Sequence, residues 1–214
     1  MEQTTVDLIV RFFVLIVSLT IHEFAHAWSA YRLGDDTAAR MGRMTLNPIS
    51  HLDPIGSLLI LTGMPLGWAK PVPVDFARLR DPRRGGSLVA LAGPASNFIL
   101  AILFCALFSF LNTRDSSPGW FQLMGYFIQI NFGLAIFNLL PLNPLDGAKV
   151  VPLFLSRDAG DRYEAFMARL GFWPLLVLFL PAMLGLKGPI NVWFDLWRPI
   201  LRPIFQIFNV PAFF

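Results

Sequence analysis

Residues 8–33 read LIVRFFVLIVSLTIHEFAHAWSAYRL, an apolar run that carries His22, Glu23 and His26 near its end. A helix needs roughly 20 residues to cross the hydrocarbon core of a bilayer, so this run is long enough to span. It lacks the basic start and the small-residue cleavage site that are typical of a signal peptide. We therefore expect a transmembrane helix over Leu8–Leu33 that is kept in the mature protein.

The composition extends this prediction to the whole chain. Of its 214 residues, 55% are hydrophobic and 14% are charged, whereas soluble domains have about 25% charged residues. Further apolar runs cover Gly86–Asn112, Trp120–Leu140 and Leu170–Leu186. A fifth run, Pro189–Phe214, contains two Arg-Pro pairs and indicates a bent or interfacial segment, and the sequence leaves open whether it spans. The predicted fold class is an all-α polytopic membrane protein with about four principal transmembrane helices in one domain, residues 1–214.

The connection Gly34–Gly85 is too long for a turn and too apolar for a disordered linker. Short runs at Arg43–Leu46, Ser57–Leu61 and Val72–Val74 are separated by Asn-Pro, Asp-Pro and glycine turn signals. Such runs predict short strands or a shallow re-entrant hairpin. We expect a β-rich connection at the cytoplasmic membrane surface.

Two connections are rich in basic residues, and the positive-inside rule places both in the cytoplasm. The N-terminus and the turn Thr113–Gly119 then lie outside, which predicts a multi-pass protein of the cell membrane. The net charge of +3 is too small and too dispersed to favour nucleic acid. The basic residues are Arg32, Arg40, Arg43, Lys70, Arg78, Arg80, Arg83 and Arg84 in the first connection, and Lys149, Arg157, Arg162 and Arg169 in the second.

The motif HEFAH predicts a metal site. His22 and His26 are four residues apart on a predicted helix, so they project from one face about one turn apart and can bind one ion together. Glu23 beside them is placed to act as acid and base near a metal-activated water. The alternative is that these are ordinary polar residues near a helix end, but three ionisable groups facing hydrocarbon are costly without a functional partner.

Asp146 is the candidate third ligand. It lies in Asn143-Pro144-Leu145-Asp146-Gly147, where Pro141 and Pro144 prevent the preceding helix from continuing. Irregular backbone at membrane depth is tolerated only in protein or beside a wet cavity. Two imidazoles, one carboxylate and an open fourth position form the pattern of a catalytic zinc site, although Asp-Gly also occurs as a simple turn.

Four other polar or reactive residues have competing interpretations. His51 is an alternative ligand or, as we favour, part of a turn in the connection. Asn138 could donate to an oxyanion or to the substrate backbone, and helix packing by its amide is almost equally compatible. Asn97 indicates packing or support of a ligand, and the single Cys105 indicates packing.

These motifs, in this order, resemble the site-2 protease family of zinc metalloproteases, peptidase family M50. The resemblance rests on HEFAH, Ala92-Gly93-Pro94, FNLLP at residues 137–141 and NPLDG at residues 143–147, and it extends through GWAKPVPV at residues 67–74. It implies one Zn2+ bound by His22, His26 and Asp146, Glu23 as acid/base, and a substrate or oxyanion role for Asn138. The chain has no inserted PDZ segment or following CBS domain and resembles the minimal form.

The function expected from this resemblance is intramembrane cleavage of single-span transmembrane proteins, with membrane lipid as surroundings. Two other classes remain open on the residues alone. A metal transporter or sensor would use the three ligands but would not need Glu23 as a base. An inactive relative would bind membrane helices without cutting them.

Overall fold

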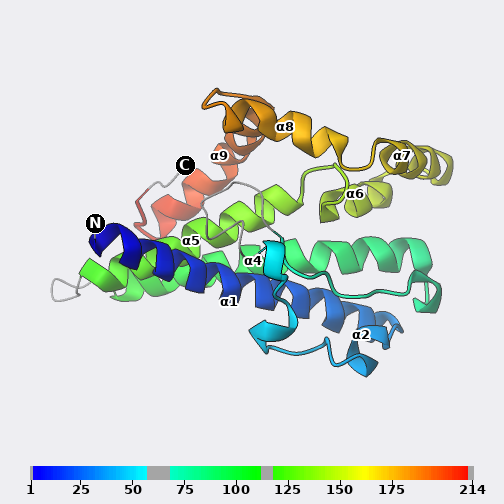
Figure 1. Ribbon diagram of the computed structural model, residues 1–214, viewed down its shortest axis with the longest axis horizontal. Coiled ribbons are helices and arrows are strands. Elements are labelled where there is room, and N and C mark those ends of the chain that lie inside the picture. Colours follow the sequence, from blue (N-terminus) through cyan, green and yellow to red (C-terminus); the bar gives the residue numbers. More distant parts are fainter. Residues whose placement is uncertain (1, 57–67, 112–117, 212–214) are drawn as a thin grey trace.

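The computed structural model describes residues 2–56, 68–111 and 118–211, most of which are helical. Three of the described helices are long and apolar enough to cross a bilayer: α1 (Glu2–Leu33), α4 (Pro82–Leu111) and α5 (Pro118–Asn138). They pack side by side along the long axis of the molecule (Figure 1). The predicted all-α polytopic fold is confirmed, and these helices contain residues 8–33, 86–111 and 120–138 of the expected runs 8–33, 86–112 and 120–140.

The fourth expected run, residues 170–186, is divided differently. Helices α7 (Arg157–Leu170) and α8 (Trp173–Met183) are bent by 59° relative to each other. Gly171 lies between them with φ +54°, a conformation that glycine adopts without steric cost. The 11 residues of α8 are about half of what a straight span needs. Only α7 and α8 together, as one broken span, are long enough to cross.

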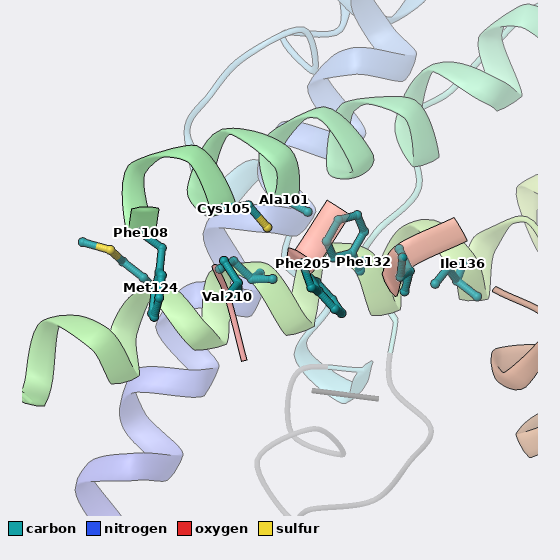
Figure 2. Packing of buried hydrophobic residues seen from close by; sticks show 10 residues of the cluster. Ala101, Cys105, Phe108, Met124, Phe132, Ile136, Phe205 and Val210 are labelled. Carbon is teal, nitrogen blue, oxygen red and sulfur yellow. The ribbon is translucent and has the colours of Figure 1, made fainter. Parts of the chain in front are cut away.

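Helix α9 (Pro189–Ile207) has 19 residues but is not among the described helices that are apolar enough to span, and Asp195, Arg198 and Arg202 interrupt its apolar residues. It instead supplies one side of the main apolar core, which lies between α4, α5 and α9 (Figure 2). Cys105 is fully buried there, as expected for a packing residue. The buried members of this core are Ala101, Cys105 and Phe108, then Met124, Ile128, Phe132 and Ile136, then Leu201, Phe205 and Val210.

The expected β-rich connection is wrong for the described part of residues 34–85. In Arg43–Leu46 the last three residues form bends and Arg43 has no regular structure, and Val72–Val74 is irregular backbone without a strand partner. The described connection contains one isolated bridge, between Leu52 and Ala69, and the short helices α2 (Thr37–Arg40), η1 (Pro48–Ser50) and η2 (Phe76–Arg78). Residues 54–56 are helical as well. The expected strand Ser57–Leu61, and residues 113–117 of the expected outer turn, lie outside the described residues.

Residues 68–75, which we call the strap, cross from η1 back to the end of α1. Pro71 and Pro73 lack the N–H groups that a β-ladder needs, which explains why no strand forms in the strap. The Lys70 N–H donates to the His51 carbonyl at 2.8 Å, and the Arg43 guanidinium donates to the Lys70 carbonyl at 2.8 Å. The strap is therefore held by hydrogen bonds from the connection itself.

Asp35 fixes the end of the strap to the end of α1. It is fully buried, and its carboxylate accepts hydrogen bonds from the Thr37 N–H and hydroxyl and from the Asp75 N–H. Burial raises the pKa of Asp35, but these hydrogen bonds and the charge of Arg40 lower it further than burial raises it, so the net pKa lies below its ordinary value. The ionised form is the one that stabilises the fold.

We expect Asp35→Asn to lower the free energy of unfolding by about 1–3 kcal/mol at pH 7, since one acceptor of a charge-assisted hydrogen bond is lost. A carboxyl group whose pKa is lowered by folding stabilises the protein above its pKa in the unfolded chain, about 3.9. This stabilisation is lost as the pH falls through the pKa of the group in the folded protein. The difference in free energy of unfolding between wild type and variant should therefore become smaller in acid. Thermal unfolding in detergent from pH 7 to pH 3 measures this, with Asp36→Asn as control, since the half-exposed Asp36 pairs with Arg40 and Arg78 at the surface. A difference in stability that does not change with pH would contradict a stabilising role of the ionised Asp35 carboxylate.

Candidate metal centre

Helix α1 brings His22, Glu23 and His26 together. All three side chains are buried, and the two imidazole Nε2 atoms lie 3.0 Å apart because residues four apart share one helix face. The two rings meet edge to face. Two nitrogen ligands thus converge on one point from a single helical turn.

Asp146 completes this group from the other side. Helix α5 ends at Asn138, and the chain turns through residues 139–145 before α6 (Asp146–Val150) begins with Asp146 itself. Its Oδ2 lies 3.1 Å from His22 Nε2 and 3.3 Å from His26 Nε2. The expected break of the helix before Asp146 is present. It places the Asp146 carboxylate beside His22, which lies 124 positions earlier in the chain.

The three ligand atoms fit a zinc ion. Ligands 2.0–2.2 Å from zinc at tetrahedral angles are roughly 3.3–3.6 Å apart, and the separations of 3.0–3.3 Å in this group are within a few tenths of an ångström of that. Two nitrogens and one carboxylate oxygen also match the donor set of catalytic zinc sites. Among the described residues, His22, His26 and Asp146 are the group of His, Cys, Asp and Glu close enough to share an ion.

The other ring nitrogen of each histidine faces an acceptor. His22 Nδ1 lies 2.6 Å from Asn97 Oδ1, and His26 Nδ1 lies 2.7 Å from the Val89 carbonyl. Nδ1 must therefore donate in both rings, which leaves the Nε2 lone pairs directed at the shared point. Both histidines have the tautomer that a metal ligand needs.

Gly93 on α4 lies directly against the two histidines. A Cβ at this position would be 2.3 Å from His26 Nε2 and 2.5 Å from His22 Nε2, closer than real Cβ contacts. Glycine at this position therefore leaves to the two histidine nitrogens the space that a side chain would fill.

We expect Gly93→Ala to weaken zinc binding by at least ~10-fold, because both ligand nitrogens must move away from the shared point. Affinity is measured on the purified chain by competition with a chelator. Gly133→Ala is the matched control, since Gly133 is also on a spanning helix and a Cβ there would meet nothing within 4 Å. Unchanged affinity in Gly93→Ala would contradict this geometry.

A cavity of about 370 Å³ opens beside the group. Its walls are the histidine turn of α1, the strap, the end of α5 and residues 144–146. Glu23 faces it, with Oε2 accepting a hydrogen bond from the Val72 N–H of the strap at 2.9 Å. Asn138 also lines the cavity, and one hydrogen of its amide is donated to the Leu134 carbonyl at 3.0 Å. The cavity is lined by all five candidate site residues that the sequence singled out: His22, Glu23, His26, Asn138 and Asp146.

His51 is placed apart from this group. It follows η1, is 1% exposed, and its Nε2 donates to the Thr45 carbonyl at 2.8 Å. The favoured interpretation as a turn residue agrees with this position.

Three contacts support the residues of the site, and only the third had a signal in the sequence, in the interpretation of Asn97 as support for a ligand. They are the Val72 N–H on Glu23, the Val89 carbonyl on His26, and the Asn97 amide on His22. The first two are backbone groups, which a residue pattern does not reveal.

Comparison with known proteins identifies the family of the chain. The model of peptidase family M50 matches residues 112–178. YwhC of Bacillus subtilis is 45% identical over 173 residues, 78% of each chain. Rip2 of Mycobacterium tuberculosis (strain H37Rv) is 34% identical over 189 residues, 85% of this chain and 71% of that one. Both relatives carry names that describe zinc metalloproteases.

No solved structure matches the chain. The match to YwhC covers more than two thirds of both chains at an identity that establishes common family membership. The chain is therefore a multi-pass membrane zinc metallopeptidase that belongs to the site-2 protease family, peptidase family M50.

Proposed function

We propose that this metallopeptidase is an intramembrane endopeptidase that cleaves the transmembrane segments of single-span proteins. The observation that carries the proposal is that His22, Glu23 and His26 lie buried on α1, a helix long and apolar enough to span. Asp146 joins them from the turn that follows a second such helix. A site built on spanning helices favours substrates that are also in the bilayer.

In this proposal His22, His26 and Asp146 hold the zinc. A zinc ion there supplies Lewis-acid chemistry, polarising a carbonyl and making water easier to deprotonate near neutral pH. Glu23 takes the proton of the water whose oxygen bonds to the carbonyl carbon of the peptide. It then delivers that proton to the amide nitrogen as the C–N bond breaks, so the products are a carboxylic acid and an amine. The Val72 N–H keeps the Glu23 carboxylate turned toward the cavity.

Asn138 is assigned to the substrate or to the developing oxyanion. One hydrogen of its amide is donated to Leu134, so the other remains available to the cavity that the residue lines. The hydrogen bond from a positioned amide donor becomes stronger as negative charge develops on the carbonyl oxygen.

The strap is assigned to substrate positioning. Alternate residues of an extended chain direct their N–H groups to opposite sides. The Val72 N–H faces Glu23, so an extended strap directs the Val74 N–H to the same side, while the prolines at 71 and 73 leave the other side without donors. An unwound substrate segment can pair with the site-facing side, as peptides do when they add to an exposed strand.

We expect Val74→Pro to lower kcat/KM by about 10-fold through a higher KM, since one backbone hydrogen bond to substrate is lost, at about 1–1.5 kcal/mol. Zinc content should not change. Val74→Ala, which keeps the N–H, controls for the packing of Val74 against the cluster around Leu79. Equal KM values in the two variants would contradict pairing at this position.

The orientation is also a proposal: N-terminus outside, metal centre toward the cytoplasm, in the cell membrane. The end of α1, the start of α4, and α6 and α7 lie at one end of the molecule (Figure 1). Basic residues of both connections belong to these elements, which agrees with a cytoplasmic location. They include Arg32, Arg83 and Arg84 of the first connection and Lys149 and Arg157 of the second.

The proposal is tested with the purified chain in liposomes that also contain single-span substrates. Cleavage that stops on removal of metal by a chelator, and returns on addition of zinc, supports it. A metal transporter predicts zinc flux across the liposome membrane and no peptide fragments, and that result would overturn the proposal.

A further inference from the structure

A buried polar network lies behind His22. Its members are Ser18 on α1, Asn97 on α4 and Asn131 on α5, each 0% exposed. None of them lines the cavity beside the metal group. Polar side chains between spanning helices are costly unless they are fully hydrogen-bonded or functional, and the hydrogen bonds of this network have a definite direction.

Asn131 sets that direction. Its Nδ2 donates to Ser18 Oγ and to the Phe127 carbonyl, both at 2.9 Å, so its Oδ1 is left as an acceptor. Asn97 Nδ2 donates to this Oδ1 at 2.8 Å and to the Ser18 carbonyl at 3.2 Å. Both amide hydrogens of Asn97 are then used, and its Oδ1 must face His22 Nδ1 at 2.6 Å.

The two histidines differ in what fixes them. His26 donates to the backbone carbonyl of Val89, an acceptor that a side-chain substitution at residue 89 does not remove. His22 donates to the side chain of Asn97, so its tautomer and ring orientation depend on one amide. Partners of this kind determine which ring nitrogen is free for a metal, and their loss typically weakens metal binding about 10–100-fold.

We propose that Asn97, oriented by Asn131 and Ser18, is a positioning residue that holds His22 in the Nδ1–H tautomer and directs its Nε2 to the zinc. This inference rests on the proposed role of His22 as a ligand. It assigns the three polar residues to the metal centre and not only to helix packing.

The test measures the zinc affinity of the full chain in detergent, by chelator competition, together with the visible absorption of the Co2+-substituted protein. Asn97→Leu removes the acceptor and should bind zinc about 10–100-fold more weakly, with a changed Co2+ spectrum. If Asn97→Leu does not fold, Asn97→Ala is measured in its place. Asn97→Asp keeps an acceptor for His22 and should stay close to wild type in zinc affinity, although it unfolds at a lower temperature because Asn131 and Ser18 lose a donor.

Thr20→Val is the matched control. It removes a buried hydroxyl that also lies on α1 but donates to the Ile16 carbonyl of its own helix, outside the network of Ser18, Asn97 and Asn131. It should keep wild-type zinc affinity, so a loss in Asn97→Leu reports the acceptor for His22 and not the removal of any buried polar group near the site. Wild-type affinity in Asn97→Leu, or equal losses in Asn97→Asp and Asn97→Leu, would overturn the inference. A wild-type chain that binds no zinc would instead overturn the proposed metal site.

Discussion

Replacing Glu23 with glutamine is expected to lower kcat for peptide cleavage by about 10²–10⁴-fold, the usual contribution of a general acid–base. Glutamine keeps the size of the side chain and an oxygen that can accept from the Val72 N–H. It cannot accept the proton of the attacking water or return it to the departing amine. Zinc content, measured by elemental analysis of the purified variant, should equal that of the wild type.

The comparison of Glu23→Gln with Glu164→Gln separates the catalytic role from general effects. Glu164 is exposed on α7, so the same chemical change there should leave kcat unaltered. Cleavage by Glu23→Gln at the wild-type rate would contradict the acid–base role. It would favour a binding or transport function for the metal group, since neither function needs a base.

Removal of the carboxylate at Asp146 is expected to have the second large effect. Asp146→Ala leaves two histidine nitrogens where the structure brings three ligand atoms together. Zinc affinity should fall by more than the ~10–100-fold that follows loss of an outer partner. Cleavage activity should fall with it and return only in part at high zinc concentration. Chelator competition and a rate measurement at several zinc concentrations check both parts.

Asp195→Ala provides the matched control for this change. Asp195 is an exposed residue of α9 that pairs with Arg198, and exposed ion pairs of this kind contribute ~1 kcal/mol or less. Its removal should leave zinc binding unchanged. If Asp146→Ala retained one zinc per chain at wild-type affinity, a different third ligand would have to exist.

Sequence reasoning located the spanning helices and the metal group because both depend on strong local patterns. Runs of about 20 apolar residues predicted α1, α4 and α5 directly. The spacing of His22 and His26 needed only helical geometry to bring their nitrogens together. Asp146 was recognisable because prolines interrupt the helix before an acid at membrane depth, where an acid needs a partner.

The remaining features depend on contacts that residue patterns do not contain. The connection was expected to form strands from its apolar runs, but Pro71 and Pro73 remove the donors that a ladder requires. The run 170–186 was expected as one span, but the chain bends at Gly171. The dependence of His22 on Asn97 joins two residues 75 positions apart and appears only once α1 and α4 are packed together.

The position of the cut within a substrate tests the central claim most directly. Wild type and Glu23→Gln are each incubated in liposomes with a single-span substrate, and mass spectrometry of the fragments identifies the peptide bond that is broken. Cleavage inside the apolar segment by wild type, and its loss in Glu23→Gln, is the predicted result. Cuts confined to the flanking aqueous sequence, or equal fragments from both proteins, would contradict intramembrane hydrolysis at this metal centre.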